Sequence, residues 1–220
     1  MFGWNEVSFF VFIFCVIFYA VMMLICIKTG KFNNRATVTR IYQNWVDARI
    51  DDLSHIITVQ TIRNSIMSNS IFISGLLLFL SIIIGLYSGE FLGDALEMDF
   101  LFTGSSIPLG IVQVSLIAII SIISLFNFIS SVRMLQRSQL LITANTKKRE
   151  DIFEKTYKLM QKTFMSAQNY WMSGVRGLFF LIPTITWLFS PIVFLVLTVF
   201  ITLFLIGWHD LSLFSKEGRE

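Results

Sequence analysis

Polar side chains lie at regular intervals in one of the apolar regions of this sequence. At 100° per residue, one face of a helix starting near position 60 collects a candidate stripe of Gln60, Arg63, Asn64, Met67, Ser74 and Ser81. Polar groups are costly inside a bilayer unless they are paired or face water, so the stripe indicates either close helix packing or the lining of an aqueous path. In a path, Arg63 near the inner mouth would favour anions. A partial counterpart occurs further along, in Ser124, Asn127, Ser130 and Ser131.

Two prolines form a second unusual feature, because each removes a backbone donor from a long apolar stretch. Serine followed by proline is typical of a helix start. The stretch is therefore predicted to be either one kinked helix, with its carbonyls satisfied by threonines, or two half-helices that meet near the middle of the membrane. Broken helices hold ions or substrates in some transporters. The candidate positions are Pro183, Trp187, Ser190 and Pro191.

Residue patterns typical of enzymes and metal sites are absent from the sequence. It has no Walker A loop, no G-x-S-x-G, no H-E-x-x-H, no C-x-x-C and no dinucleotide-binding glycine fingerprint. Cys15 and Cys26 would lie ~16 Å apart along a helix, which excludes an intrachain disulfide. Since His55 and His209 are expected on opposite sides of the membrane, a thiolate metal site lacks further ligands. We expect structural thiols, no catalytic, cofactor-binding or metal-binding residues, and no enzymatic activity.

The composition of the chain predicts the helices that carry these residues. Hydrophobic residues make up 55% of the 220-residue chain, charged residues 14%, and the mean hydropathy is +0.73, which is too apolar for one soluble core. A helix needs ~20 apolar residues to cross a hydrocarbon layer of about 30 Å. We therefore predict an all-α, polytopic membrane helical bundle, a single membrane domain over 1–220, with four transmembrane helices at about 7–27, 66–87, 108–132 and 178–206.

The charges between these stretches predict an orientation. Six basic residues fall in 28–65 and nine in 133–177, whereas 88–107 has no Lys or Arg and four acids. By the positive-inside rule, both basic segments face the cytoplasm, and the acidic segment and both termini lie outside the cell membrane. The acids Glu90, Asp94 and Glu97 have helical spacing and would offer a calcium site only with backbone oxygens; a solvated loop is the alternative.

Both inner segments, about 39–65 and 133–177, have the mixed three and four spacing of helices. Their basic amphipathic character would suit anionic lipid headgroups, and the alternative is a charge bias that only fixes topology. The net charge is only +3 and no nucleic-acid-binding module is present, so we expect no nucleic-acid partner.

Two blocks of the sequence resemble the membrane family catalogued as domain of unknown function 599. The family's tryptophan followed by V-Q-T-L-R-N-x-x-M matches Trp45 and then Val59, Gln60, Thr61, Ile62, Arg63, Asn64 and Met67. Its G-x-R-x-x-Y-F and P-x-x-x-W-L-F-G-P blocks match Gly174, Arg176, Phe179, Phe180, Pro183, Trp187, Leu188, Phe189 and Pro191. The sequence departs at Ser190, where the family has glycine, and lacks the histidine often found after Arg133. The resemblance implies the membrane topology and no particular activity.

Three classes of function are compatible with these observations. The first is a small homo-oligomeric channel or transporter, with the second span lining the path and the acidic outer segment forming a vestibule. The alternative is a structural or accessory subunit of a larger membrane complex without transport activity of its own. An intramembrane enzyme ranks last. The expected partners are the lipid bilayer, including anionic headgroups at the cytoplasmic face, and further copies of the chain or a membrane complex.

Overall fold

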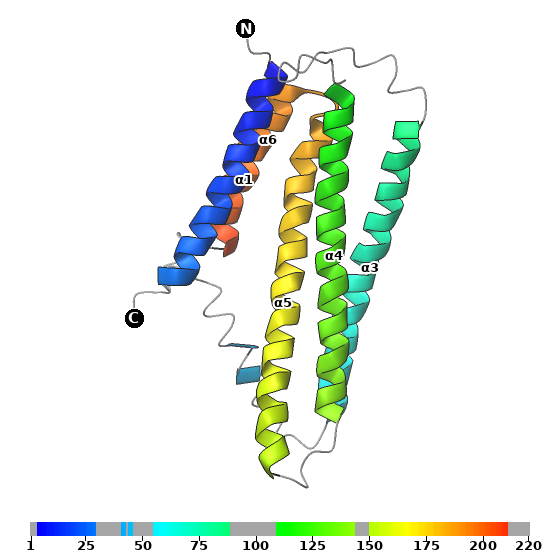
Figure 1. Cartoon of the computed structure of the whole chain (residues 1–220), viewed down its shortest axis with the longest axis vertical. Helices are drawn as coiled ribbons and strands as arrows, with labels where there is room; N and C mark the ends of the chain where they lie inside the picture. The colour runs from blue at the N-terminus through cyan, green and yellow to red at the C-terminus, as the bar shows by residue number, and fades with distance from the viewer. Residues whose placement is uncertain are drawn as a thin grey trace. The chain divides into compact units, whose positions relative to one another are not determined.

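The computed structural model describes residues 4–29, 41–42, 44–45, 55–88, 109–143 and 150–210 (Figure 1). The elements in these ranges are α1 (Trp4–Thr29), α3 (His55–Ser88), α4 (Leu109–Thr143), α5 (Glu150–Thr186), α6 (Pro191–Phe204) and the π-helical turn η2 (Leu205–Asp210). None of the described residues forms a strand. The prediction of an all-α fold is therefore confirmed.

Three of these helices are long and apolar enough to cross a membrane. Their apolar stretches are Trp4–Ile25 in α1, Ile57–Gly85 in α3 and Leu109–Ile142 in α4, with mean hydropathies of 2.8, 2.1 and 2.5. They overlap the first three predicted spans. The shorter apolar stretch Pro191–Gly207 covers α6 and the start of η2. In contrast, α5 is amphipathic, as the pattern of its basic inner segment predicts.

The fourth predicted span, 178–206, is not one continuous helix. Residues 178–186 end α5, a turn follows at residues 187–190, and α6 begins at Pro191. Ring contacts between Trp187 and Phe194 and between Phe179 and Phe204, with centroids 4.9 and 5.8 Å apart, place α6 antiparallel to the end of α5. Figure 1 shows this reversal at the turn between the end of α5 and the start of α6. The segment is therefore broken just before Pro191, as one of the two predicted alternatives has it, and its two helical parts form a hairpin; a kink within one helix is not observed.

The local backbone explains why the break lies where it does. Ser190 is extended, with φ −158° and ψ 125°, and Pro191 is the first residue of α6, as the serine–proline pair predicts. The Ser190 side chain makes no capping hydrogen bond. Pro183 lies inside α5, where the hydroxyls of Thr184 and Thr186 donate to the Leu181 and Pro183 carbonyls at 2.8 Å.

The described helices contribute to two compact units. The first contains α1, α6, η2 and the residues 82–88, 109–120 and 178–186 of the long helices. Its core holds Phe12, Tyr19, Leu109, Phe180, Trp187, Phe194, Ile201, Leu205 and Ile206. The second contains residues 55–81 of α3, 121–143 of α4 and 150–177 of α5. Its core holds Ile62, Leu135, Met160, Phe164 and Ala167. That residues 1–220 form a single membrane domain stays a prediction.

Several predicted features lie outside the described residues. These are the acidic segment from residue 89 to 107, the basic run at 147–149, and most of the inner segment before residue 55. The side chains of Cys26, His55 and His209 lie outside them as well.

Candidate functional site

The structure places the predicted stripe on an exposed face of α3. Gln60, Arg63, Asn64, Ser74 and Ser81 are all exposed, and Met67 is 63% exposed. Close packing of the stripe against the other described helices of the same chain is therefore not observed.

The same face is less polar than the sequence pattern indicates. Ile71 and Leu78, which are 67% and 66% exposed, share it with the serines because they follow at helical spacing. The strongly polar side chains on this face are Gln60, Arg63 and Asn64. They lie near the N-terminal end of α3.

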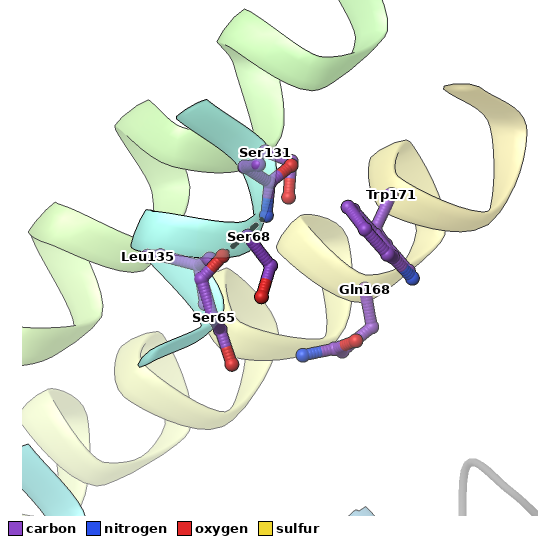
Figure 2. A pocket seen from close by; sticks show the side chains of 7 residues that line it. Ser65, Ser68, Ser131, Leu135, Gln168 and Trp171 are labelled. Atoms are coloured by element: carbon purple, nitrogen blue, oxygen red, sulfur yellow. Dashed lines mark hydrogen bonds between the residues drawn. The ribbon is translucent and has the colours of Figure 1, made fainter. Parts of the chain in front are cut away.

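A polar cavity lies within the second unit, among α3, α4 and α5 (Figure 2). Its volume is about 180 Å³, and its wall is made by Ser65, Ser68, Asn69, Ser131, Leu135, Gln168 and Trp171. In Figure 2, the serines of α3 lie across the cavity from Gln168 and Trp171 of α5. No residue of the wall carries a formal charge.

The three serine hydroxyls in this wall each donate a hydrogen bond to a backbone carbonyl. Ser65 and Ser68 donate to the Thr61 and Asn64 carbonyls at 3.1 Å, and Ser131 donates across to the Ala167 carbonyl of α5 at 3.0 Å. Because a carbonyl oxygen can only accept a hydrogen bond, the hydroxyl is the donor in each of these pairs. In this arrangement the three hydroxyl oxygens offer lone pairs to the cavity, and the wall also contains the N–H groups of Gln168 and Trp171.

Asn69 adds an acceptor that has no partner. Its side chain is 2% exposed, and its Nδ2 donates to the Ser65 carbonyl at 2.9 Å, which fixes the orientation of the amide. Its Oδ1 is buried and makes no hydrogen bond. Leaving such a group unsatisfied costs about 1–3 kcal/mol. Asn69 was missed in the sequence analysis, although it is the one amide that follows Asn64 in α3.

Small residues let α4 and α5 approach closely beside the cavity. A Cβ added at Gly177 would collide with Ser124 Oγ, and one at Gly174 would lie 2.9 Å from the Phe128 ring. Ser124 and Ser131, from the predicted counterpart of the stripe, are buried in this contact. The other two members, Asn127 and Ser130, are half-buried, and the Asn127 amide donates to the carbonyl of Ile123. The contact thus resembles the small-residue packing typical of membrane helices.

Trp171 borders the cavity inside a group of aromatic rings. Its ring meets those of Phe72 and Phe128 edge to face, with centroids 5.3 and 5.4 Å apart and interplanar angles of 67° and 66°. Phe72 and Phe128 stack on each other at 5.2 Å. These contacts come from three helices and hold the indole in place.

The positions of the second sequence block meet in the hairpin of the first unit. Trp187 is 1% exposed, its Nε1 donates to Asn5 Oδ1 at 3.3 Å, and its carbonyl accepts from Gln113 Nε2 at 3.0 Å. Its ring stacks on Phe9 and Phe194, with centroids 5.6 and 4.9 Å apart. Trp187 therefore ties the turn to α1, α4 and α6.

Two further predicted positions lie in the second unit. Trp45 stacks on Phe164 with ring centroids 5.3 Å apart, and Arg176 is half-buried in α5. Cys15 is a free, half-buried thiol in α1. Among the side chains that the structure describes, no three of the His, Cys, Asp and Glu residues come together as a metal site.

Comparison with known proteins gives one match. The sequence matches the family described as "Protein of unknown function, DUF599" over residues 7–212. No curated protein and no solved structure matches it. Because the match covers nearly the whole chain, including the stripe, the cavity wall and the hairpin, this protein belongs to the DUF599 family.

Proposed function

We propose that this protein is a homo-oligomeric membrane channel or transporter in which the inner end of α3 lines a polar path between copies. The observation that carries the proposal is the exposure of Gln60, Arg63 and Asn64 on a helix long and apolar enough to cross a membrane. On insertion scales, an arginine at the centre of a membrane helix costs about 2.5–3.5 kcal/mol, and the cost falls where the group reaches water. Contact with water or with a second chain at this face would remove that free-energy cost.

Several copies are needed because the stripe is directed away from the cores of its own chain. Asn69 lies nine residues after Gln60 and so on the opposite side of α3, where it is buried. A closed ring of copies would place the exposed sides of α3 around one axis. Arg63 would then favour anions at the inner mouth.

An accessory subunit would use the same exposed face differently. A different membrane protein would cover Gln60, Arg63 and Asn64, and a companion in constant ratio would remain after extraction in mild detergent. Purification of a stable assembly that contains only this chain supports the homo-oligomer.

Replacing Arg63 by alanine is expected to change flux without changing the assembly. If Arg63 lowers the barrier to anions, Arg63→Ala reduces anion flux into reconstituted vesicles by roughly tenfold, which corresponds to ~1.4 kcal/mol. Arg137, an exposed arginine on α4, provides the control, and Arg137→Ala should leave flux unchanged. Equal fluxes in wild type and Arg63→Ala, with the oligomer intact, would rule out this lining.

The hairpin also changes the orientation that we propose. Ser8 Oγ donates to the Pro191 carbonyl at 3.0 Å, and Phe12 meets Phe194 at a centroid distance of 5.4 Å, so α1 and α6 run in the same direction. Because α1 leads into the first basic segment, which the positive-inside rule places in the cytoplasm, α6 also ends on the cytoplasmic side. The N-terminal end then lies outside and the C-terminal end inside.

Reporters fused after Glu220 test this orientation. We expect fluorescence from a fluorescent protein that matures only in the cytoplasm, and no activity from a phosphatase that works only outside. The same reporters placed before Met1 should give the reverse result. An active phosphatase after Glu220 would instead support the four-span prediction, with both termini outside.

A further inference from the structure

We infer that α5 carries a second polar face, which meets water at membrane depth, and that Arg176 binds a small inorganic anion there. The face consists of Lys158, Lys162, Asn169, Ser173 and Arg176. The inference deepens the channel proposal by naming the class of substrate. It rests on the orientation proposed above, in which α5 leaves the cytoplasmic side and α6 returns to it.

The five side chains share one face because they follow one another at intervals of three, four and seven residues. All except Arg176 are exposed, and Arg176 is half-buried. Ala167 lies nine residues before Arg176 and therefore on the opposite side of α5, where it is buried in the core of the second unit. The polar face is thus directed away from that core.

Contacts between α5 and α4 give the depth of this face. Residues 109–132 of α4 carry no charge and are enough, at 1.5 Å per residue, to cross a hydrocarbon layer of about 30 Å, so their end marks its inner edge. The Ala167 carbonyl accepts from Ser131 at this level, at 3.0 Å. Further in, a Cβ at Gly177 would meet Ser124, so the two helices run antiparallel. The residues of α5 after Ala167 therefore lie inside the layer.

A charged side chain at this depth needs water beside it. Arg176 lies nine residues after Ala167, or ~13 Å beyond the inner edge. Arginine is costly there when it faces lipid. Lys158 and Lys162 continue the same face to the cytoplasmic side of that edge, so the polar surface is continuous with cytoplasmic water.

The charge of the face selects an anion. From residue 155 to 186, α5 contains basic residues and no Asp or Glu. The guanidinium of Arg176 presents N–H donors in a planar fork that fits oxyanions, and Asn169 and Ser173 carry further N–H and O–H groups. Lysines at the inner end raise the local concentration of anions.

The polar face ends one turn after Arg176. Phe180 follows at helical spacing, is 8% exposed and belongs to the core of the first unit. Arg176 is therefore the last polar residue that an anion reaches along this face from the cytoplasmic side, which favours a binding site at this position.

The test is the labelling of engineered cysteines in inside-out membrane vesicles, which present the cytoplasmic side to the reagent. The background is the full chain with Cys15 and Cys26 replaced by alanine, since these are its only cysteines. Ser173→Cys should react with a charged thiosulfonate that does not cross membranes. Phe126→Cys provides the matched control.

Phe126 lies level with Ser173 on the neighbouring helix. The rings of Phe128 and Trp171 meet with centroids 5.4 Å apart, and two residues further along each antiparallel helix are Phe126 and Ser173. Phe126 is 64% exposed and shares its face with the exposed side chain of Ile122.

A charged reagent reaches a lipid-facing thiol only by entering hydrocarbon. Ser173→Cys should therefore react roughly a hundredfold faster than Phe126→Cys, a ratio that corresponds to ~2.7 kcal/mol. Equal rates at the two positions would overturn the inference and leave this face of α5 to lipid or to a dry contact with another chain.

The charge of the reagent tests the anion site, once each rate is divided by that with a free thiol in solution. In Ser173→Cys, an anionic thiosulfonate should react about tenfold faster than a cationic one. Arg176→Gln should abolish this preference, whereas Arg176→Lys should keep it. An unchanged preference in Arg176→Gln would contradict a site at Arg176.

Competition answers the same question if Arg176→Gln does not fold. At equal ionic strength, sodium nitrate should slow the anionic reagent at Ser173→Cys more than sodium gluconate does, because gluconate is too large for a site of this kind. Equal rates in the two salts would contradict the site.

Labelling and flux separate this inference from the channel proposal. Fast labelling of Ser173→Cys with unchanged flux in Arg63→Ala would support the α5 face and reject the lining by α3. Slow labelling with reduced flux in Arg63→Ala would reject the α5 face and support the lining by α3.

Discussion

Replacing Trp187 by alanine is expected to destabilise the protein more than any other single substitution considered, by about 3–5 kcal/mol, the usual cost of removing a large buried aromatic side chain. The side chain is 1% exposed and stacks between Phe9 and Phe194. Its loss would leave a cavity at the point where the turn meets α1 and α6. In a chain of this size, Tm in detergent should fall by roughly 6–20 °C.

A second aromatic residue in the same turn provides the control. Phe189 is 85% exposed, so Phe189→Ala should change stability by less than about 0.5 kcal/mol. Trp187→Phe keeps a ring but loses the hydrogen bond to Asn5, and should cost about 1 kcal/mol beyond the change in packing. Equal effects of Trp187→Ala and Phe189→Ala would contradict the role of Trp187 in fixing the hairpin.

The hairpin also shows what the sequence could and could not predict. Long apolar stretches are sufficient to identify α1, α3 and α4, because length and hydropathy decide whether a helix crosses a membrane. The serine–proline pair correctly marked the start of α6. The reversal was missed because the turn, residues 187–190, is nearly as apolar as the helices around it. Its direction depends on contacts of Trp187 with α1 and α4, which no local pattern contains.

The sequence likewise predicted some residues of the candidate sites and missed others. Helical spacing correctly put Gln60, Arg63 and Asn64 on one face of α3, but spacing does not say whether a face is covered. The structure exposes that face and buries Asn69 on the other side. A single amide among serines carries no periodic signal, and its importance appears only when α4 and α5 close over it. Ser131 was noted from the sequence, whereas Gln168 and Trp171 come from a helix that the four-span prediction divided between a cytoplasmic helical segment and a span.

Replacing Gly177 by alanine is expected to separate α4 from α5 and to cost about 1–3 kcal/mol, the usual range for adding a methyl group to a closely packed contact. The new Cβ would collide with Ser124 Oγ and lie 3.1 Å from Ser124 Cβ. Ser124 cannot easily move away, because it is 1% exposed and fixed on its own helix. Thermal unfolding of Gly177→Ala and of Gly177→Ala with Ser124→Gly measures the coupling, and the second change should restore most of the loss.

Gly75 provides the matched control for this prediction. It also lies inside a helix, but a Cβ there meets nothing within 4 Å, so Gly75→Ala should be neutral or stabilising by up to ~1 kcal/mol through helix propensity. If Gly177→Ala were equally harmless, α4 and α5 could not be as close as Ser124 and Gly177 indicate.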